Sequence, residues 1–349
     1  MHAPPPTPSD FVAFMKEREE LRRRRASGVA PPWTNDSILA QYHFTNVKRE
    51  HDATTQWMRE HWTGPNGDSA TAGEVVFNCA LFRHFGTVAF AQQIGWVCDF
   101  CPEACVRAAV AARRACGHAF TRAYCLPSFN AEIKSEENAR REYEKKCQRV
   151  LLPLWRRRHE FDAMCALGKW RDVAVLLGEM PGFGGSGFMA KETLLDVMQT
   201  RHLRHCSDRN EWTGIGPGAR RGLNRLAGRH KHAGQGGRGR KRKCPEESGK
   251  ASLEKESSAK VEDDRKEAKV GDDSLVAECV ALYRECWRLD PAWCHSVRID
   301  LSDTQFQLCE FDKYLRIRNR EGGRARRYAP HTGSAAHGLP PTGEQGTGK

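Results

Sequence analysis

Two glycine-rich turns are the segments of this 349-residue chain whose residue types most clearly suggest chemistry. The first, at 180–190, reads MPGFGGSGFMA and has a helical pattern on each side. Glycines let backbone N–H groups approach a phosphate, and the second helix offers its N-terminus to an anion. The pattern is typical of a helix–hairpin–helix, so we expect Gly182 and Gly184 to contact DNA phosphates. A glycine-rich connection between two packed helices is the alternative.

The same turn is not a nucleotide-binding P-loop. Gly182 and Gly187 have the separation of that motif, but Phe188 occupies its lysine position and no strand precedes it. The sequence therefore excludes a kinase site here.

The second turn, at 212–223, reads WTGIGPGARRGL. Its two arginines fall in the first turn of a helix, where positive charge opposes the helix dipole. A bound phosphate or pyrophosphate would explain this arrangement, so we expect Gly216, Gly218, Arg220 and Arg221 to form an anion site. The alternative is a solvated basic turn with tight packing at Gly222.

The net charge of +12 is concentrated in one part of the chain. Residues 201–243 contain 13 Lys and Arg but only two acidic residues, which is typical of a surface for nucleic acid. The basic run 237–243 also matches a nuclear-import patch, for a cell that has a nucleus. The chain opens MHAPPP and has no long apolar run, so we expect an intracellular protein without membrane spans and with reduced cysteines.

Three further groups are candidates for acid–base or metal chemistry. Asp196 stands among apolar helix neighbours, which favours a perturbed pKa or a helix cap. Glu310 and Lys313 share a face of the last helix and predict either base contact or an exposed ion pair. The segment Cys98-x-x-Cys101 has only half of a zinc spacing, so we expect thiols and no metal.

The elements that would position these residues are helices, because no segment alternates in the manner of a strand. Helical patterns cover 11–27, 34–62, 74–95, 102–116, 135–152, 158–167, 169–179, 188–200, 218–228, 274–289 and 303–318. Ser9 or Asp10, Thr34, and the pair Ser302 and Gln305 are the expected caps at three of the starts. We therefore expect an all-α fold: a disordered 1–9, a helical domain at 10–232, a disordered basic and acidic insertion at 233–273, the last helices at 274–328 and a disordered tail at 329–349.

Several blocks, in order along the chain, resemble one family. They are PWTND at 32–36, YHFTNV at 42–47, FRHFG at 82–86, Ala123-Tyr124, PGFG at 181–184, GPGARRGL at 216–223 and LCEFDKY at 308–314. Together they resemble the helical domain of the 5-hydroxymethyluracil DNA kinases, also called alpha-glutamyl/putrescinyl thymine pyrophosphorylases. The resemblance implies a DNA-glycosylase-like helical fold and work in thymine hypermodification, in which a hydroxymethyl base is phosphorylated and an amine displaces pyrophosphate.

The resemblance also implies site residues. They are Trp33, Thr34, Asp36, Asn46, Arg49, Glu50 and Asp52. With Asp196, Glu310 and Lys313, which the residue patterns indicate, the base-binding candidates are Trp33, Thr34, Asp36, Asn46, Arg49 and Glu310, and the catalytic candidates are Glu50, Asp52, Asp196 and Lys313. An acidic, basic and amide cluster beside an aromatic ring can grip a flipped base by hydrogen bonds and stacking. An ion-pair network between helices is the alternative.

Three functions remain open from the sequence. The chain is a transferase or pyrophosphorylase-like enzyme acting on a modified thymine, a base-excision enzyme that uses Asp196, or a DNA-binding module without catalysis. The expected partners are double-stranded DNA with a flipped base and a separate kinase, and no cofactor is expected.

Overall fold

The computed structural model describes residues 4–121, 135–233, 272–322 and 327. Nearly all of the expected insertion, the run 237–243, the tail 329–349 and Ala123-Tyr124 lie outside the described residues. Every regular element of the described part is helical, and its β-type pairing is confined to a bridge between Tyr42 and Arg327. The expected all-α class is confirmed. None of the described helices has the length and apolar character needed to cross a bilayer.

The first helix, α1 (Pro8–Ala26), begins earlier than expected. Thr7 Oγ1 accepts a hydrogen bond from the Asp10 backbone, and the Asp10 carboxylate accepts one from the Thr7 backbone. Thr7 is therefore the N-cap, rather than Ser9 or Asp10, because this reciprocal pair satisfies two otherwise free donors.

The segment after Trp33 departs most from the sequence prediction. In place of one helix to residue 62, it forms α2 (Ser37–Gln41), a 3₁₀ turn η1 (Arg49–His51), α3 (Ala53–Met58), a π turn η2 (Arg59–Thr63) and α4 (Gly64–Asn66). Asp36, not Thr34, caps α2, and Asp52 caps α3 by accepting from the Thr55 backbone. Residues 42–48 are an irregular connection, so Asn46 does not share a helix with Arg49.

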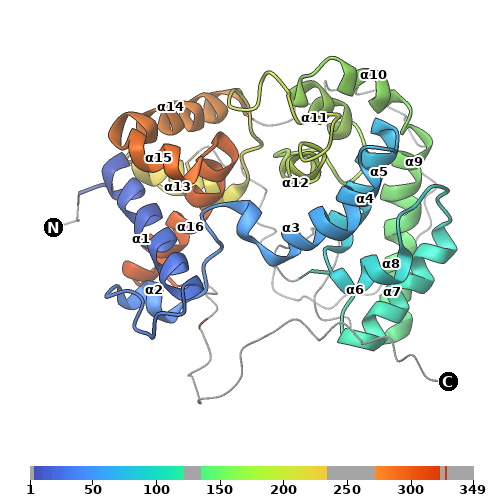
Figure 1. The fold of residues 1–349 in the computed structure, drawn as a ribbon, viewed down its shortest axis with the longest axis horizontal. Helices are drawn as coiled ribbons and strands as arrows, with labels where there is room; N and C mark the ends of the chain where they lie inside the picture. Colours follow the sequence, from blue (N-terminus) through green and yellow to red (C-terminus); the bar gives the residue numbers. More distant parts are fainter. Residues whose placement is uncertain (1–3, 122–134, 234–271, 323–326, 328–349) are drawn as a thin grey trace, which may run out of the picture.

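The middle of the chain forms one group of helices, on the right of Figure 1, here called the middle lobe. It comprises α5 (Ala72–Phe85), α6 (Val88–Ile94), α7 (Pro102–Cys116), α8 (Glu136–Lys146), a π turn η3 (Cys147–Leu151), α9 (Leu152–Arg156), α10 (Glu160–Ala166) and α11 (Trp170–Gly178). Helix α5, in which every residue except Glu74 is buried, is its centre, with Phe77 and Phe82 in the core. The pattern at 74–95 breaks into two helices because Gly86 adopts a left-handed conformation (φ 69°) that ends α5.

The two ends of the chain together form a second group, the terminal lobe (Figure 1). It contains α1, α2, α13 (Pro217–Leu226), α14 (Asp273–Leu289), α15 (Pro291–Val297) and α16 (Leu301–Arg318). Phe11 and Phe14 of α1 pack edgewise or tilted on Phe311 of α16, with ring centroids 5.3 and 5.2 Å apart. The α16 capping box is formed by Asp300 and Asp303, not by Ser302 and Gln305, so this helix begins at Leu301.

Helices α3 and α12 (Phe188–Val197) lie between the lobes in Figure 1. Helix α12 packs on α5 and on α11, and residues 179–187 form the turn that joins α11 to α12. The expected arrangement of a helix on each side of the glycine-rich turn is therefore present. Polar residues of α12 meet polar residues of the terminal lobe at this junction.

Candidate functional site

A buried network of charged side chains joins the two lobes. Arg49 of η1 donates from Nη1 to Glu192 Oε2 at 2.8 Å and from Nη2 to Asp196 Oδ1 at 3.1 Å. Arg83 of α5 donates from Nε to Asp196 Oδ2 at 2.5 Å and from Nη2 to Asp196 Oδ1 at 2.7 Å. Glu192 and Asp196 lie one turn apart on α12, so three elements converge on a single charged cluster.

Asp196 is engaged by arginines on both of its oxygens and is 3% exposed. Such a carboxylate holds Arg49 and Arg83 in fixed orientations and has no oxygen directed to solvent. This arrangement favours a positioning role for Asp196, and it matches the ion-pair alternative raised from the sequence.

Lys191 adds a fully buried ammonium to the same helix. Its Nζ lies 3.1 Å from Glu192 Oε1, donates to Gln305 and sits 3.8 Å from the centroid of the Phe306 ring. Burial lowers the pKa of Lys191. Burial by itself would raise the pKa of Glu192, but Arg49 and Lys191 outweigh it and lower that pKa to about 2. Glu192 is therefore ionised at neutral pH.

A depression lies over this network, between the lobes, and is here called the inter-lobe hollow. Its narrow part has an open volume of about 310 Å³ and is lined by Arg49, Glu50, Thr55, Leu195, Gln199, Arg209, Asp300, Ser302, Asp303 and Phe306. Its wide part, of about 890 Å³, shares Glu50, Gln199, Arg209 and Asp300 and adds Lys48, His51, Arg59, Val297 and Arg298. The two parts are thus one continuous surface that contains both charged and apolar groups.

Glu50 faces both parts of the hollow and is the least satisfied of its carboxylates. Its Oε2 is shielded from solvent and accepts no hydrogen bond within the described ranges, and the nearest cation, Lys48 Nζ, is 3.6 Å away. Lys48 is instead directed to Asp303 and to the Arg298 carbonyl oxygen, the latter at 2.7 Å. A buried acceptor without a donor is costly, and a ligand that supplies an N–H or O–H group would satisfy it.

Two aspartates at the start of α16 form the opposite wall. Asp300 accepts from Arg209 at 3.1 Å, while Asp303 accepts from Lys48. Burial, and then the neighbouring Asp300, raise the pKa of Asp303 well above that of an ordinary aspartate. Two close carboxylates with separated pKa values are an arrangement that can hold or release a proton.

The mouth of the hollow carries arginines without acidic partners. The Arg59 and Arg298 side chains form no hydrogen bond or ion pair with any described residue, and both are exposed. Arg298 also adopts a left-handed backbone conformation, φ 55°, which is strained for a residue with a side chain. This strain is compatible with a functional position at the mouth.

The residues predicted at 46–52 separate in the structure. Arg49 and Glu50 line the inter-lobe hollow, whereas Asn46 lines a different pocket. The Asn46 amide donates to the His51 carbonyl at 2.7 Å, and Asp52 serves as the cap of α3. A single helix over 34–62, as predicted, would place all four on adjacent turns; that prediction is wrong, because 42–48 is not helical.

The other base-site candidates, Trp33, Thr34 and Asp36, lie within the terminal lobe and form hydrogen bonds with neighbouring residues of that lobe. Thr34 donates to Glu17 at 2.6 Å, and Trp33 Nε1 donates to the Val29 carbonyl at 2.6 Å. Asp36 caps α2 and accepts from Tyr314 at 2.6 Å. These contacts fix the path of the chain between α1 and α2 against α16.

Glu310 and Lys313 also join elements of the terminal lobe. Glu310 accepts from the Thr45 backbone at 3.3 Å, and its other contact is Lys313 Nζ at 3.3 Å. Lys313 donates to the His43 carbonyl and lies 4.6 Å from the centroid of the Phe44 ring. Both residues therefore anchor the 42–46 connection to α16.

The two glycine-rich turns meet each other. A Cβ on Gly214 would lie 2.7 Å from the Gly187 carbonyl oxygen, and one on Gly216 would lie 3.6 Å from the Phe188 ring. Gly182 and Gly187 have φ values of 91° and 70°, which favour glycine. The turns thus bring the N-termini of α12 and α13 together, while contact with a DNA phosphate stays a prediction.

The arginines of the second turn are largely paired with acids. Arg221 donates to Asp312 Oδ2 at 2.7 Å, and Arg225 donates to Asp312 Oδ1 at 2.8 Å. Arg220 lies 3.9 Å from Asp272. Gly218 and Gly222 allow α13 to approach α16, since a Cβ on Gly222 would lie 2.4 Å from the Leu308 carbonyl oxygen. Ion pairing and tight packing therefore explain much of this motif.

Sequence reasoning missed several polar residues of the junction: Lys48, Arg83, Lys191, Glu192, Arg209, Asp300 and Asp303. Lys191 and Glu192 carried the same signal as Asp196, namely charges within an apolar helix pattern. All cysteines in the described ranges are free thiols, and those ranges hold no group of three or more His, Cys, Asp or Glu side chains that could hold a metal ion.

Comparison with known proteins identifies the family. A family model described as "5-hmdU DNA kinase, helical domain" matches residues 6–324. A 5-hmdU DNA kinase of Bacillus phage SP10 is 24% identical over 231 residues, which cover 61% of this chain and 35% of that protein. The match thus spans about a third of the relative's length, and no solved structure matches significantly. Because the family match covers most of the sequence, this chain belongs to the helical-domain family of the 5-hmdU DNA kinases.

Proposed function

We propose that this chain binds a modified thymine in DNA at the inter-lobe hollow and acts in thymine hypermodification. The observation that carries the proposal is Glu50, a shielded acceptor without a donor, which faces a hollow of mixed polar and apolar lining. Family membership supports the same class of substrate, because the similar phage protein is named a 5-hmdU DNA kinase.

The lining of the hollow suits a pyrimidine extruded from the duplex. Glu50 Oε2 would accept from the O–H of a 5-hydroxymethyl group, which thymine lacks, and Gln199 offers both a donor and an acceptor. Phe306 provides an apolar surface beside Arg49. In this proposal Asp196 orients Arg49, and Asp303 is the group able to hold a proton near the base.

The DNA backbone would be held at the mouth of the hollow. Arg59 and Arg298 are exposed and without acidic partners among the described residues, so they can neutralise phosphates. A second phosphate contact is proposed at the N-terminus of α12. It consists of the glycine-rich turns with Gly182, Gly184, Gly216 and Gly218. In a cell with a nucleus, the run 237–243 would direct import.

The phosphoryl-transfer step of hypermodification is assigned to a separate kinase partner. Residues 182–188 have the glycine spacing of a P-loop but not its lysine. This chain would then present or convert the base, as a transferase or pyrophosphorylase-like enzyme, while the partner supplies ATP chemistry.

The test compares duplexes that differ only in one base, thymine or 5-hydroxymethyluracil, by fluorescence anisotropy at fixed salt. We expect about tenfold tighter binding of the modified duplex, since one hydrogen bond to a charged group contributes about 1.5–3 kcal/mol. Glu50→Gln should remove this preference and leave the affinity for the thymine duplex unchanged. Equal affinity of the wild-type chain for both duplexes would contradict the proposal.

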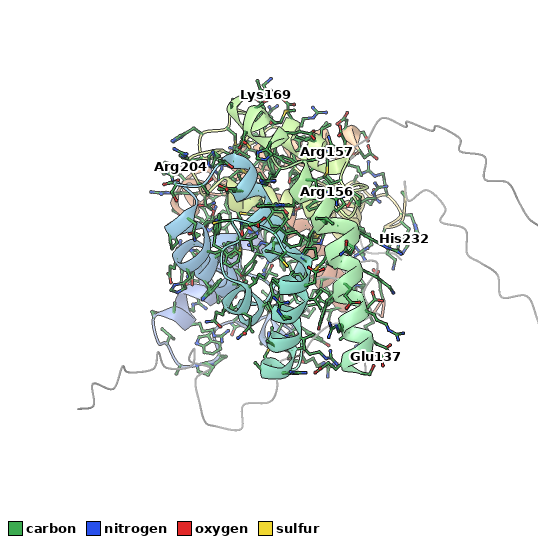
Figure 2. The ribbon with its side chains drawn as sticks, turned by 90° about the vertical axis from the view of Figure 1, so that its right-hand side faces the viewer. Glu137, Arg156, Arg157, Lys169, Arg204 and His232 are labelled. Carbon is green, nitrogen blue, oxygen red and sulfur yellow. The ribbon has the colours of Figure 1, made fainter. Side chains whose placement is uncertain are left out.

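Nucleoside mass spectrometry after incubation separates the possible reactions. A heavier nucleoside that forms with an added amine or kinase supports hypermodification, whereas an abasic site identifies base excision. Binding without either product identifies a recognition module. Arg141→Gln is the matched control, because Arg141 pairs with Glu137 on exposed helix α8, and Figure 2 shows Glu137 on the outer face of the middle lobe.

A further inference from the structure

A second pocket lies entirely within the terminal lobe and has no role in the function proposed above. It is an open pocket of about 470 Å³, lined by residues of α1, of α2 and of the connection that follows α2. Its lining consists of Arg18, Leu21, Arg22, Arg25, Leu39, Tyr42, Phe44, Thr45 and Asn46, and it is here called the arginine–aromatic pocket.

The electrostatics of this pocket favour an anion. Three of its lining residues are arginines and none is acidic. Arg22 is neutralised by Glu19, with contacts of 3.0 and 2.6 Å. The exposed Arg25 guanidinium has no acidic partner in the described part of the chain, and it lies 5.4 Å from the centroid of the Trp33 ring. Its planar, forked donors match the geometry of a phosphate.

The other side of the pocket is suited to a planar ring. Tyr42 is fixed by Arg327, which donates to its hydroxyl from Nε at 3.0 Å and from Nη2 at 2.9 Å. Leu21 and Leu39 supply apolar surface next to it. A rigid aromatic ring between aliphatic side chains is a surface on which a base can stack.

Polar groups for the edge of such a ring are also present. The Asn46 amide nitrogen is occupied by the His51 carbonyl, which fixes the side chain at the pocket wall. Thr45 is exposed, and its backbone N–H is held by Glu310. A phosphate site, a stacking surface and polar edge groups thus line one open pocket.

We propose that the arginine–aromatic pocket binds one nucleotide unit, with its phosphate on Arg25 and its base against Tyr42. The nucleotide is either free in solution or part of a DNA strand that leaves the inter-lobe hollow. Residues 46–49 connect the two sites, since Asn46 lines the pocket and Arg49 lines the hollow.

The first experiment titrates the full chain with dTMP, dAMP and inorganic phosphate by calorimetry. We expect the nucleotides to bind more tightly than phosphate. Arg25→Gln should weaken nucleotide binding about tenfold, and Tyr42→Leu should weaken it by about five- to a hundredfold. Arg141→Gln should leave it unchanged. Arg25 is exposed and Tyr42 half-buried, so both variants should fold, which circular dichroism melting verifies.

The second experiment repeats the anisotropy measurement with single-stranded and duplex oligonucleotides. If only oligonucleotide binding falls in both Arg25→Gln and Tyr42→Leu, the nucleotide comes from DNA. If free nucleotides bind and respond to both changes, the source is a soluble nucleotide. The proposal is overturned if Arg25→Gln and Tyr42→Leu bind both free nucleotides and oligonucleotides as tightly as the wild-type chain does. It is also overturned if their loss of affinity is no larger than that of Arg141→Gln. The free-nucleotide arm needs no modified base, so its result does not depend on the proposed function.

Discussion

Helix α13 and the mouth of the inter-lobe hollow both present arginines, but with different partners. In α13, Arg221 and Arg225 share the buried Asp312, and Arg225 also contacts Glu321 at 2.7 Å. At the mouth, Arg59 and Arg298 have no acidic partner in the described ranges and come from distant parts of the chain. A cluster of basic residues in sequence is therefore a poor guide to positive charge that remains available for a ligand.

The same comparison applies to buried acids. Asp196 holds the buried Arg83 together with Arg49, which has Glu192 as a second acid. Asp312 holds Arg221, which reaches water, and Arg225, which has Glu321 as a second acid. The junction should therefore depend on its carboxylate more strongly than the α13–α16 contact does, because an unpaired buried charge is costly.

The largest effect is expected for Asp196→Asn. Loss of its charge leaves Arg49 and Arg83 without their shared partner, and we expect a loss of about 3–5 kcal/mol in the free energy of unfolding. Urea denaturation measures it. Asp312→Asn should cost less, because Arg225 keeps Glu321. Equal losses in the two variants would remove the distinction between the regions.

The pH dependence of stability should identify the same junction. Arg49 and Lys191 lower the folded-state pKa of Glu192 to about 2, below its ordinary value of 4.5. Stability from this group is thus fully present above about pH 4.5 and is lost as the pH falls toward 2, by at most about 3 kcal/mol. Glu192→Gln should be less stable at pH 7 and should show a shallower loss between pH 4.5 and 2. An unchanged slope in urea titrations across this window would argue against the assignment.

Gly222→Ala tests whether the second glycine-rich turn serves packing. The added Cβ would meet the Leu308 carbonyl oxygen at 2.4 Å, so α13 must move away from α16. We expect a loss of about 1–3 kcal/mol in thermal or urea unfolding. DNA affinity measured below the melting temperature should not change. Retained stability with impaired DNA binding would instead favour the anion-site interpretation.

The smallest effect is expected in the salt dependence of DNA binding. Arg298→Gln removes one proposed phosphate contact and should reduce the slope of log K against log salt by about 0.9. Arg59→Gln should do the same. Arg221→Gln should leave the slope unchanged, because Asp312 already neutralises that arginine. The reverse ranking would place the phosphate contacts on α13.

Much of the fold was predictable because helix signals are local. The pattern at 102–116 predicts α7 to the residue, and the turn at 179–187 lies between two helices as its glycines indicate. The site was predicted only in part. Arg49 and Glu50 do line the hollow, but the family blocks at Trp33, Thr34 and Asp36 serve mainly to connect α1, α2 and α16.

The helical class, the bounds of α7 and the glycine-rich turn between two helices follow from the sequence, because each depends on local spacing. Tertiary structure decided which charges pair: Arg83 with Asp196, Arg221 with Asp312, and Lys48 with Asp303. These partners are separated by 91 to 255 residues. Charge pairing depends on distance in space, which only the packing of the helices sets.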